Sequence, residues 1–194
     1  MRSTIRNCVI GFVAVALTSQ TAAYAVDLNK SRLSTIDLKE CKQLSKHRDG
    51  GGWLCPGLRG YPIYLAEGDL RQMVGFGPAP QNRTSSKQTL ASFNTIFSGK
   101  RRPTVEWRVE RDARGRVVPF ATIVRFHTSS GDTKGDVLVI TKVDPKDSCR
   151  LAVIEASANP DAMSIARTWA ISEAKKMPCP AAPIVLGTPG KGPM

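Results

Sequence analysis

Residues 104–111 read TVEWRVER, an alternation of apolar and charged side chains. The apolar residues share one side of an extended chain and the charged residues the other, namely Val105, Trp107 and Val109 against Glu106, Arg108 and Glu110. A period of two is the pattern of a β-strand with one buried and one solvent-facing side. The stretch therefore predicts a half-buried strand whose charged residues point into solvent.

Three more apolar runs follow this strand, and a short turn sequence separates each from the next. The runs cover residues 118–127, 137–143 and 151–156, and the turns lie at 113–115, 129–132 and 144–147. Strands joined by turns this short pair antiparallel with their neighbours in sequence. The sequence therefore predicts a four-stranded antiparallel meander.

A β-hairpin is predicted ahead of the meander. Two runs rich in aromatic and aliphatic residues, 61–66 and 70–76, flank the turn sequence Glu67-Gly68-Asp69. Short apolar runs on both sides of a glycine-containing turn are typical of a hairpin. A further short strand is expected within residues 34–42.

Two stretches predict helices. Ser85 and Gln88 have capping-box spacing ahead of apolar residues at helical spacing, so we expect a short helix near 87–98. A second helix, near 160–177, begins at residues 159–161 with a cap, a first-turn proline and a carboxylate at the positive end of the helix dipole. Its apolar stripe comprises Met163, Ala166, Ala170, Ala174 and Met177. We expect this helix to cover one face of the meander.

These elements predict an α+β fold with a mostly antiparallel sheet, built from a hairpin plus a meander, and a C-terminal helix packed on one face. A single domain is expected over residues 34–179. Residues 180–194 are rich in proline and glycine and lack a core pattern. We expect a disordered tail there.

The first residues have the pattern of a secretory signal peptide. Arg2 and Arg6 precede an apolar run over residues 8–17, and Ala23-Tyr24-Ala25 is a small-x-small cleavage site. The apolar run is well short of the ~20 residues that span a bilayer. We therefore expect residues 1–25 to be cleaved off after Ala25. The mature protein would be periplasmic or secreted, with no transmembrane segment.

Four cysteines follow the leader, namely Cys41, Cys55, Cys149 and Cys179. In an exported chain they predict two disulfides, for which three pairings exist. A zinc site at Cys41, His47 and Cys55 is disfavoured because it offers three ligands and no close pair. We expect a Cys41–Cys55 disulfide, with residues 50–52 (GGG) as the bend and His47 exposed. Cys149 would then bond Cys179, joining the start of the last strand to the end of the last helix.

Two stretches resemble a known group of proteins. The first runs from Cys55-Pro56-Gly57 through residues 60–62 to residues 67–71, and the second joins residues 105–108 to residues 119–126. Over most of residues 35–179 the chain resembles an uncharacterised family of exported, periplasmic proteins of alphaproteobacteria with no assigned activity. The resemblance implies a bacterial periplasm and supplies no catalytic residue.

The chemistry-bearing residues form no catalytic motif. His127 is followed by two serines and Asp132, but a catalytic triad needs three groups that converge in space, and no Gly-x-Ser-x-Gly elbow is present. A small hydrolase that uses His127 with Glu67 or Asp69 is the alternative that we carry forward. The aspartate pairs 132/136 and 144/147 raise a calcium hypothesis, but neither has EF-hand spacing, and turn roles explain them. We therefore expect no catalytic, metal or cofactor site.

Positive charge is the strongest functional signal. The formal net charge is +12, of which the leader supplies two charges. Residues 83–116 hold nine Lys/Arg against three acids, with the candidate anion-binding residues Lys100, Arg101, Arg102, Arg114 and Arg116. Such a patch attracts anions. Export argues against nucleic acid as a partner, and so does Trp107, which shares the apolar side of its strand and offers no base-stacking platform.

We therefore expect an exported, non-enzymatic binding or accessory protein. Its basic surface would bind an anionic envelope component or an acidic protein, without a cofactor. The sequence carries no signal for an oligomeric state.

Overall fold

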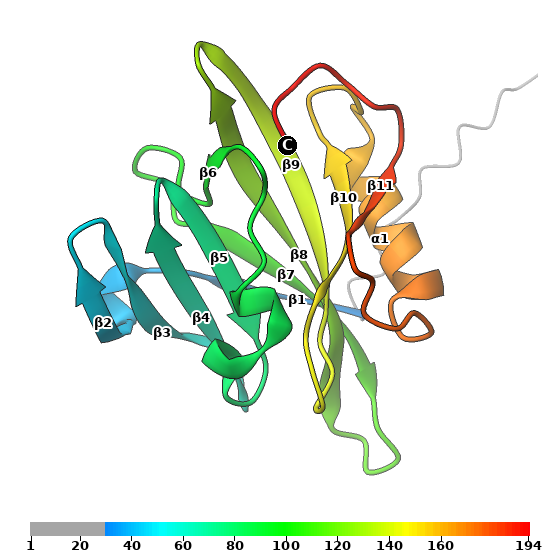
Figure 1. The fold of residues 1–194 in the computed structure, drawn as a ribbon. Helices are drawn as coiled ribbons and strands as arrows, with labels where there is room; N and C mark the ends of the chain where they lie inside the picture. Colours follow the sequence, from blue (N-terminus) through cyan, green and yellow to red (C-terminus); the bar gives the residue numbers. More distant parts are fainter. Residues whose placement is uncertain (1–29) are drawn as a thin grey trace, which may run out of the picture.

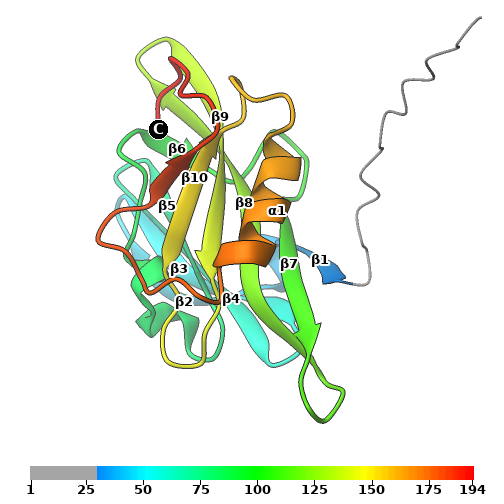
Figure 2. The same cartoon turned by 90° about the vertical axis from the view of Figure 1, so that its right-hand side faces the viewer.

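The structure, a computed structural model, describes residues 30–194, so the predicted signal peptide lies outside the described residues. Within this range two mostly antiparallel sheets pack face to face, and helix α1 (Ala162–Glu173) covers the outer face of the larger sheet (Figure 1). Figure 2 shows α1 lying across the meander strands. The predicted α+β class, with a C-terminal helix on one face of a mostly antiparallel sheet, is confirmed.

The larger sheet contains the predicted meander. Its strands lie in the order β1 (Ser31–Thr35), β7 (Thr104–Arg111), β8 (Val117–Ser130), β9 (Thr133–Lys142), β10 (Arg150–Glu155) and β11 (Ile184–Leu186). β7 through β10 pair antiparallel with their sequence neighbours. β8 is longer than β7, and its far end pairs with β6 (Phe93–Thr95) instead. Along one edge of β8, the partner strand thus changes from β7 to β6 around residues 125–127.

The smaller sheet has the order β2 (Lys42–His47), β3 (Gly50–Leu58), β4 (Tyr61–Gly68) and β5 (Arg71–Phe76). The predicted hairpin is β4–β5, and its two turn residues, Asp69 and Leu70, both have positive φ, as the tight hairpin turn requires. The glycines at 50–52 were expected to form a bend, but they begin β3 instead. Gly50 lies so close to β4 that a Cβ atom would stand 2.0 Å from the Glu67 carbonyl oxygen.

Two cores hold these layers together. Between the sheets, apolar side chains of β4 and β5 meet those of β7, β8 and β9, and Trp107 contacts Phe76 edge to face at 5.5 Å. Between the larger sheet and α1, the three alanines of the predicted stripe are buried, namely Ala166, Ala170 and Ala174, and so is Ala162. These small side chains let the helix approach the sheet closely.

The helix predicted near 87–98 is not formed. Two 3-10 turns, η3 (Pro80–Asn82) and η4 (Thr84–Ser86), precede an irregular segment and β6. The two capping-box residues serve distant partners. The Ser85 amide donates to the Ser148 carbonyl at 2.7 Å, and Gln88 Oε1 accepts from the Arg150 amide at 2.7 Å. Tertiary hydrogen bonds therefore replace the local ones that a helix would need.

The C-terminal segment was expected to be disordered, but it packs on the domain. β11 pairs parallel with β10. Asn159, predicted as a helix cap, instead bonds the backbone of Thr188 through both side-chain amide atoms. The Gly192 amide donates to Glu155 Oε1, and the Ser92 amide donates to the Met194 carbonyl. This segment supplies its own edge strand without a hydrophobic pattern, which is why composition alone misjudged it.

Both predicted disulfides are present. Cys41 is bonded to Cys55, which ties the short turn η2 (Leu38–Glu40) to β3. Cys149 is bonded to Cys179, which ties the start of β10 to the segment after α1. His47 is exposed at the end of β2, as expected.

Candidate functional site: an arginine-lined pocket beside the helix

Two of the three charged residues expected to face solvent on β7, Glu106 and Arg108, are buried, whereas Glu110 is exposed as expected. Glu106 is 5% exposed and Arg108 is 2% exposed, because α1 covers this side of the sheet. Burial of a charge is costly unless the charge is paired and hydrogen-bonded. The two residues therefore depend on each other and on neighbouring elements.

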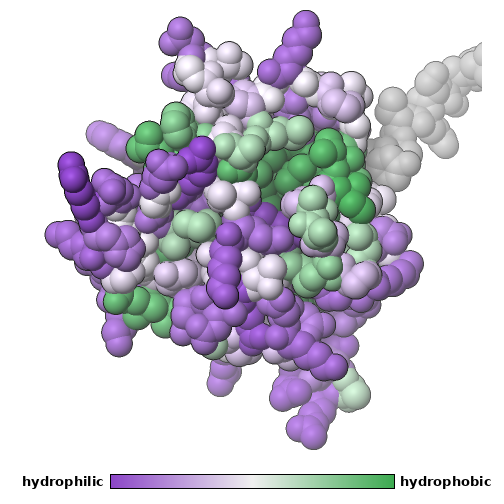
Figure 3. Space-filling view, in the orientation of Figure 1, coloured by the Kyte–Doolittle hydropathy of each residue, from purple (hydrophilic) through white to green (hydrophobic). Residues whose placement is uncertain are grey.

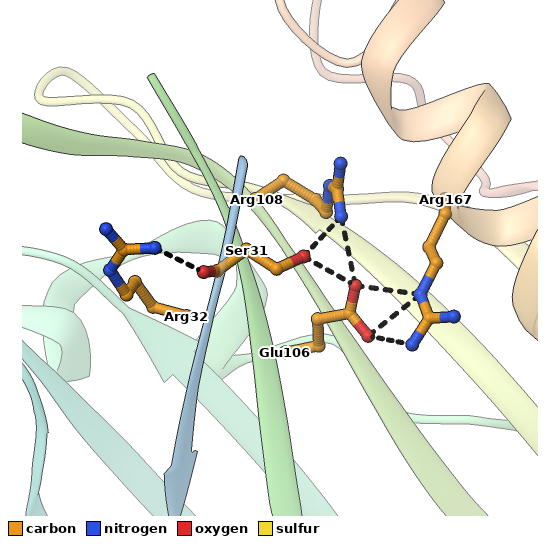
Figure 4. Close-up of polar contacts among 5 residues, drawn as sticks. All are labelled: Ser31, Arg32, Glu106, Arg108 and Arg167. Atoms are coloured by element: carbon orange, nitrogen blue, oxygen red, sulfur yellow. Dashed lines mark hydrogen bonds and ion pairs between the residues drawn. The ribbon is translucent and has the colours of Figure 1, made fainter. Parts of the chain in front are cut away.

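Four residues form what we call the Glu106 cluster: Ser31, Glu106, Arg108 and Arg167 (Figure 4). Glu106 Oε1 accepts from Ser31 Oγ at 3.0 Å, Arg108 Nη1 at 3.1 Å and Arg167 Nε at 2.9 Å. Glu106 Oε2 accepts from Arg167 Nη2 at 2.7 Å, and Arg108 also contacts the Ser31 hydroxyl. The cluster joins β1, β7 and α1.

The cluster holds Glu106 in its charged form. Burial raises the pKa of Glu106, but hydrogen bonds from Arg167, Ser31 and Arg108 outweigh it, so the pKa lies below the ordinary value. The same contact raises the pKa of Arg167. Because Glu106 already accepts hydrogen bonds on both oxygens, it offers little further capacity to a bound molecule.

A cavity of about 400 Å³ adjoins the cluster, and we call it the arginine pocket. Its charged and titratable lining consists of Arg101, Arg102, Glu106, Arg125, His127 and Arg167. Leu33, Ile123 and Met163 are among the residues that supply apolar walls. Pockets with an apolar body and a few converging polar groups are the usual form of small-molecule sites.

Sheet geometry explains how these residues meet. Ile123, Arg125 and His127 alternate along β8 and so point to the same side of the sheet as Glu106. Arg101 and Arg102 precede β7 in the chain, and Arg167 reaches over from α1. The pocket therefore lies where β7 begins, beside the part of β8 at which the partner strand changes from β7 to β6.

The four pocket arginines differ in how far they are neutralised. Arg167 pairs with Glu106, and Arg102 Nη2 lies 2.9 Å from Asp37 Oδ2. Arg125 has only a long contact to Asp136, at 3.4 Å. The Arg101 guanidinium has no hydrogen bond or ion pair with any residue from 30 to 194. Arg101 and Arg125 are thus the guanidinium groups most available to a ligand.

His127 forms the second chemical feature of the pocket. Its Nδ1 lies 2.5 Å from Asp136 Oδ1, and its side chain is one-third exposed. It also borders two neighbouring cavities, one with Lys134 and Ser157 and one with Glu67. Of the carboxylates proposed as partners of His127, Glu67 therefore shares a cavity with it. Asp69 lies at the hairpin turn and pairs with Arg71.

The structure divides the predicted basic patch. Lys100, Arg101 and Arg102 precede β7, whereas Arg114 and Arg116 lie in the turn after it. β7 has eight residues, and an extended strand rises about 3.3 Å per residue, so the two groups are separated by roughly 25 Å. Arg116 is neutralised locally by Asp112 at 2.7 Å, and backbone and side-chain hydrogen bonds from Arg116 lower the pKa of Asp112. Figure 3 shows hydrophilic surface over the β7–β8 hairpin, below the apolar surface near β11.

Arg125 and Arg167 were missed as site residues, and each left a weak signal. Arg125 and His127 interrupt an apolar strand at a spacing of two, which marks a polar stripe on one side of it. Arg167 lies one turn beyond Met163 and beside the alanine stripe. Neither signal shows that the two side chains meet, because that depends on how α1 crosses the sheet.

Three of the four aspartates considered for calcium have other roles. Asp136 bonds His127, Asp144 accepts from the Lys146 amide, and Asp147 accepts from both the amide and hydroxyl of Thr84. Burial raises the pKa of Asp147, but the hydrogen bonds from Thr84 lower it below the ordinary value. Among residues 30–194, no three His, Cys, Asp or Glu side chains cluster in a way that suits a metal ion.

Comparisons of the chain with protein-family models, with curated proteins and with solved structures found no match. Within the described range, no helix is long and apolar enough to cross a membrane. The two disulfides fit an exported protein.

Proposed function

We propose that the protein is an exported, non-enzymatic binding protein whose arginine pocket receives an anionic group. The observation that carries the proposal is the convergence of Arg101, Arg102, Arg125 and Arg167 on one cavity of about 400 Å³. The only carboxylate in that lining, Glu106, is saturated by hydrogen bonds within its own cluster.

Guanidinium groups suit this role for a physical reason. Each presents a planar fork of N–H donors that matches carboxylate and phosphate oxygens, and each stays charged at any physiological pH. The four pocket arginines pair with the carboxylates of Asp37, Glu106 and Asp136 or lack a partner, and Arg108 also pairs with Glu106. The site therefore holds five arginines against three carboxylates. An anion would therefore complete the charge balance of the site.

The location of the protein narrows the source of that anion. The signal-peptide pattern and the two disulfides support export, and the resemblance over residues 35–179 supports a bacterial periplasm. Anionic components of the cell envelope, or an acidic protein there, are the partners that such a compartment offers. The basic turn at Arg114 and Arg116 would add long-range attraction and no specific contact.

The test compares two double variants of equal charge change. Arg101→Ala/Arg125→Ala removes the two least-neutralised pocket arginines, and Arg114→Ala/Arg116→Ala removes two arginines from the hairpin turn. Calorimetric titration with inorganic phosphate and with sulfate at low salt should show at least a tenfold loss for the pocket variant, since a hydrogen bond to a charged group contributes roughly 1.5–3 kcal/mol. The turn variant should bind nearly as wild type. Equal losses in both variants would contradict the pocket assignment.

The contact between His127 and Asp136 favours a second candidate function, a small hydrolase. A carboxylate on Nδ1 orients an imidazole so that Nε2 can accept a proton from a nucleophile or water. If this function is correct, wild-type protein should hydrolyse p-nitrophenyl acetate or p-nitrophenyl phosphate, and His127→Ala should abolish the reaction. A rate in the wild type no greater than that of the variant would exclude it.

A further inference from the structure

The arginine pocket is rich in hydrogen-bond donors and poor in acceptors. Arginine side chains donate only. Both oxygens of Glu106 already accept from the Glu106 cluster. The hydroxyls of Ser98 and Thr104, which also line the cavity, can rotate to donate or to accept and so do not discriminate between ligands. One ring nitrogen of His127 is the exception.

Asp136 fixes which nitrogen of His127 can accept. His127 and Asp136 are directly opposite each other in the β8–β9 register, and Asp136 Oδ1 lies 2.5 Å from His127 Nδ1, where it accepts a hydrogen bond from the Nδ1–H group. In the neutral imidazole, Nε2 is then left as an acceptor. Nε2 has no hydrogen bond with any residue from 30 to 194, and the side chain lines the pocket at one-third exposure.

We infer that the arginine pocket selects anions that carry a hydroxyl donor beside the charge, and that His127 Nε2 accepts from that hydroxyl. The inference rests on the proposed function, because it names the ligand chemistry of the same pocket. Two sources share this chemistry: a hydrogen phosphate group, and a sugar acid whose ring hydroxyls flank its carboxylate. Asp136 is a positioning residue, since it acts through His127.

The first test compares hydrogen phosphate with sulfate, which have similar shape and equal charge, whereas only phosphate carries a proton. At about pH 8, where inorganic phosphate is mainly the dianion, calorimetry should show hydrogen phosphate binding about tenfold more tightly than sulfate, the value of one hydrogen bond. His127→Leu should abolish the preference for hydrogen phosphate over sulfate. His127→Gln, which keeps an acceptor oxygen, should retain part of it.

The outcomes separate this inference from the proposed function. Equal binding of the two anions in the wild type, or a preference that persists in both His127 variants, would overturn the role of His127 in recognising a phosphate hydroxyl and leave the anion-binding function standing. Failure of both anions to bind the wild type would contradict the proposed function itself. Circular dichroism and the melting temperature of each variant show that the comparison is made on folded protein.

The second test separates the two sources. Glucuronate is compared with cyclohexanecarboxylate, which has a ring of the same size and the same charge but no hydroxyl. Tighter binding of glucuronate than of hydrogen phosphate would assign the pocket to acidic glycans, and the reverse order would assign it to phosphate groups. Equal binding of glucuronate and cyclohexanecarboxylate, together with equal binding of phosphate and sulfate, would overturn the inference for both sources.

Discussion

The two faces of the larger sheet each bury an arginine, and the two arginines are stabilised in different ways. On the helix side, Arg108 is 2% exposed and bonds Glu106. On the side facing the smaller sheet, Arg150 is 1% exposed, and its guanidinium lies 5.2 Å from the centre of the Phe126 ring. Among residues 30–194, both terminal nitrogens of Arg150 are buried without a hydrogen-bond partner.

The difference shows that the helix side of the sheet supplies a carboxylate partner to its buried arginine, whereas the side facing the smaller sheet does not. A carboxylate partner offsets much of the desolvation cost of a buried cation. An aromatic face alone offsets less of that cost. Burial accordingly lowers the pKa of Arg150 to about 10. The paired arginine belongs to the cluster that borders the arginine pocket, whereas the unpaired one lies in the apolar core between the sheets.

Removal of the carboxylate from the helix side should have the largest effect. Glu106→Gln would leave Arg108 buried without its counter-charge, which typically costs about 3–5 kcal/mol of the free energy of unfolding. Urea denaturation measures this loss. Glu110→Gln is the matched control, because Glu110 lies on the same strand but pairs with Lys175 at the surface, and it should change stability by less than about 1 kcal/mol. Equal losses of stability in the two variants would show that Glu106 does not stabilise the fold more than a surface carboxylate does.

Replacement of Arg150 should have the opposite sign. Arg150→Met removes an unpaired buried charge and keeps an unbranched side chain, so we expect stability to be unchanged or to rise by about 1–3 kcal/mol. Arg108→Met should destabilise the protein. A marked loss of stability in Arg150→Met would mean that the guanidinium has a favourable partner, and the contrast between the two faces would fail.

The two arginine environments predict pH dependences in different windows. The pKa of Glu106 is lowered on folding, so its contribution is present above the ordinary value of 4.5 and is lost as the pH falls further. The deficit of Glu106→Gln should therefore shrink below about pH 4.5. Burial lowers the pKa of Arg150 from its ordinary value to about 10. Its cost is present below about pH 10 and is relieved as the pH rises above that value, so Arg150→Met should lose its advantage there.

The smallest expected effect concerns the aromatic contact. A double-mutant cycle with Phe126→Leu and Arg150→Met, followed by thermal or urea unfolding, measures the coupling between the ring and the guanidinium. We expect a favourable coupling of about 1–2 kcal/mol, the range for a desolvated cation–π contact. A coupling near zero would leave Arg150 without any stabilising partner in the described range.

The elements that the sequence predicted correctly depend on local patterns. The meander follows from alternation and short turns, and the hairpin follows from the turn at residues 67–69. The helix over 160–177 was predicted from its alanine stripe, and α1 occupies 162–173. The expected helix near 87–98 failed because Ser85 and Gln88 bond Ser148 and Arg150, more than sixty positions away in the chain.

The arginine pocket could be predicted only in part. The run at residues 100–102 was singled out, and Arg101 and Arg102 do line the cavity. Arg125 and Arg167 were not, because each looks like an ordinary polar residue in its own element. The role of Asp136 depends on its place opposite His127, which requires the β8–β9 register to be known.

The sequence by itself determined the strands of the meander, the hairpin, both disulfides and the burial of Trp107. Each of these depends on period, turn residues or cysteine spacing, which are properties of neighbouring positions. Only the tertiary structure decided that Glu106 and Arg108 on β7 are buried and that four arginines share a cavity. The physical reason is that alternation shows which residues share a side of a strand, whereas whether that side meets water depends on the helix that packs over it.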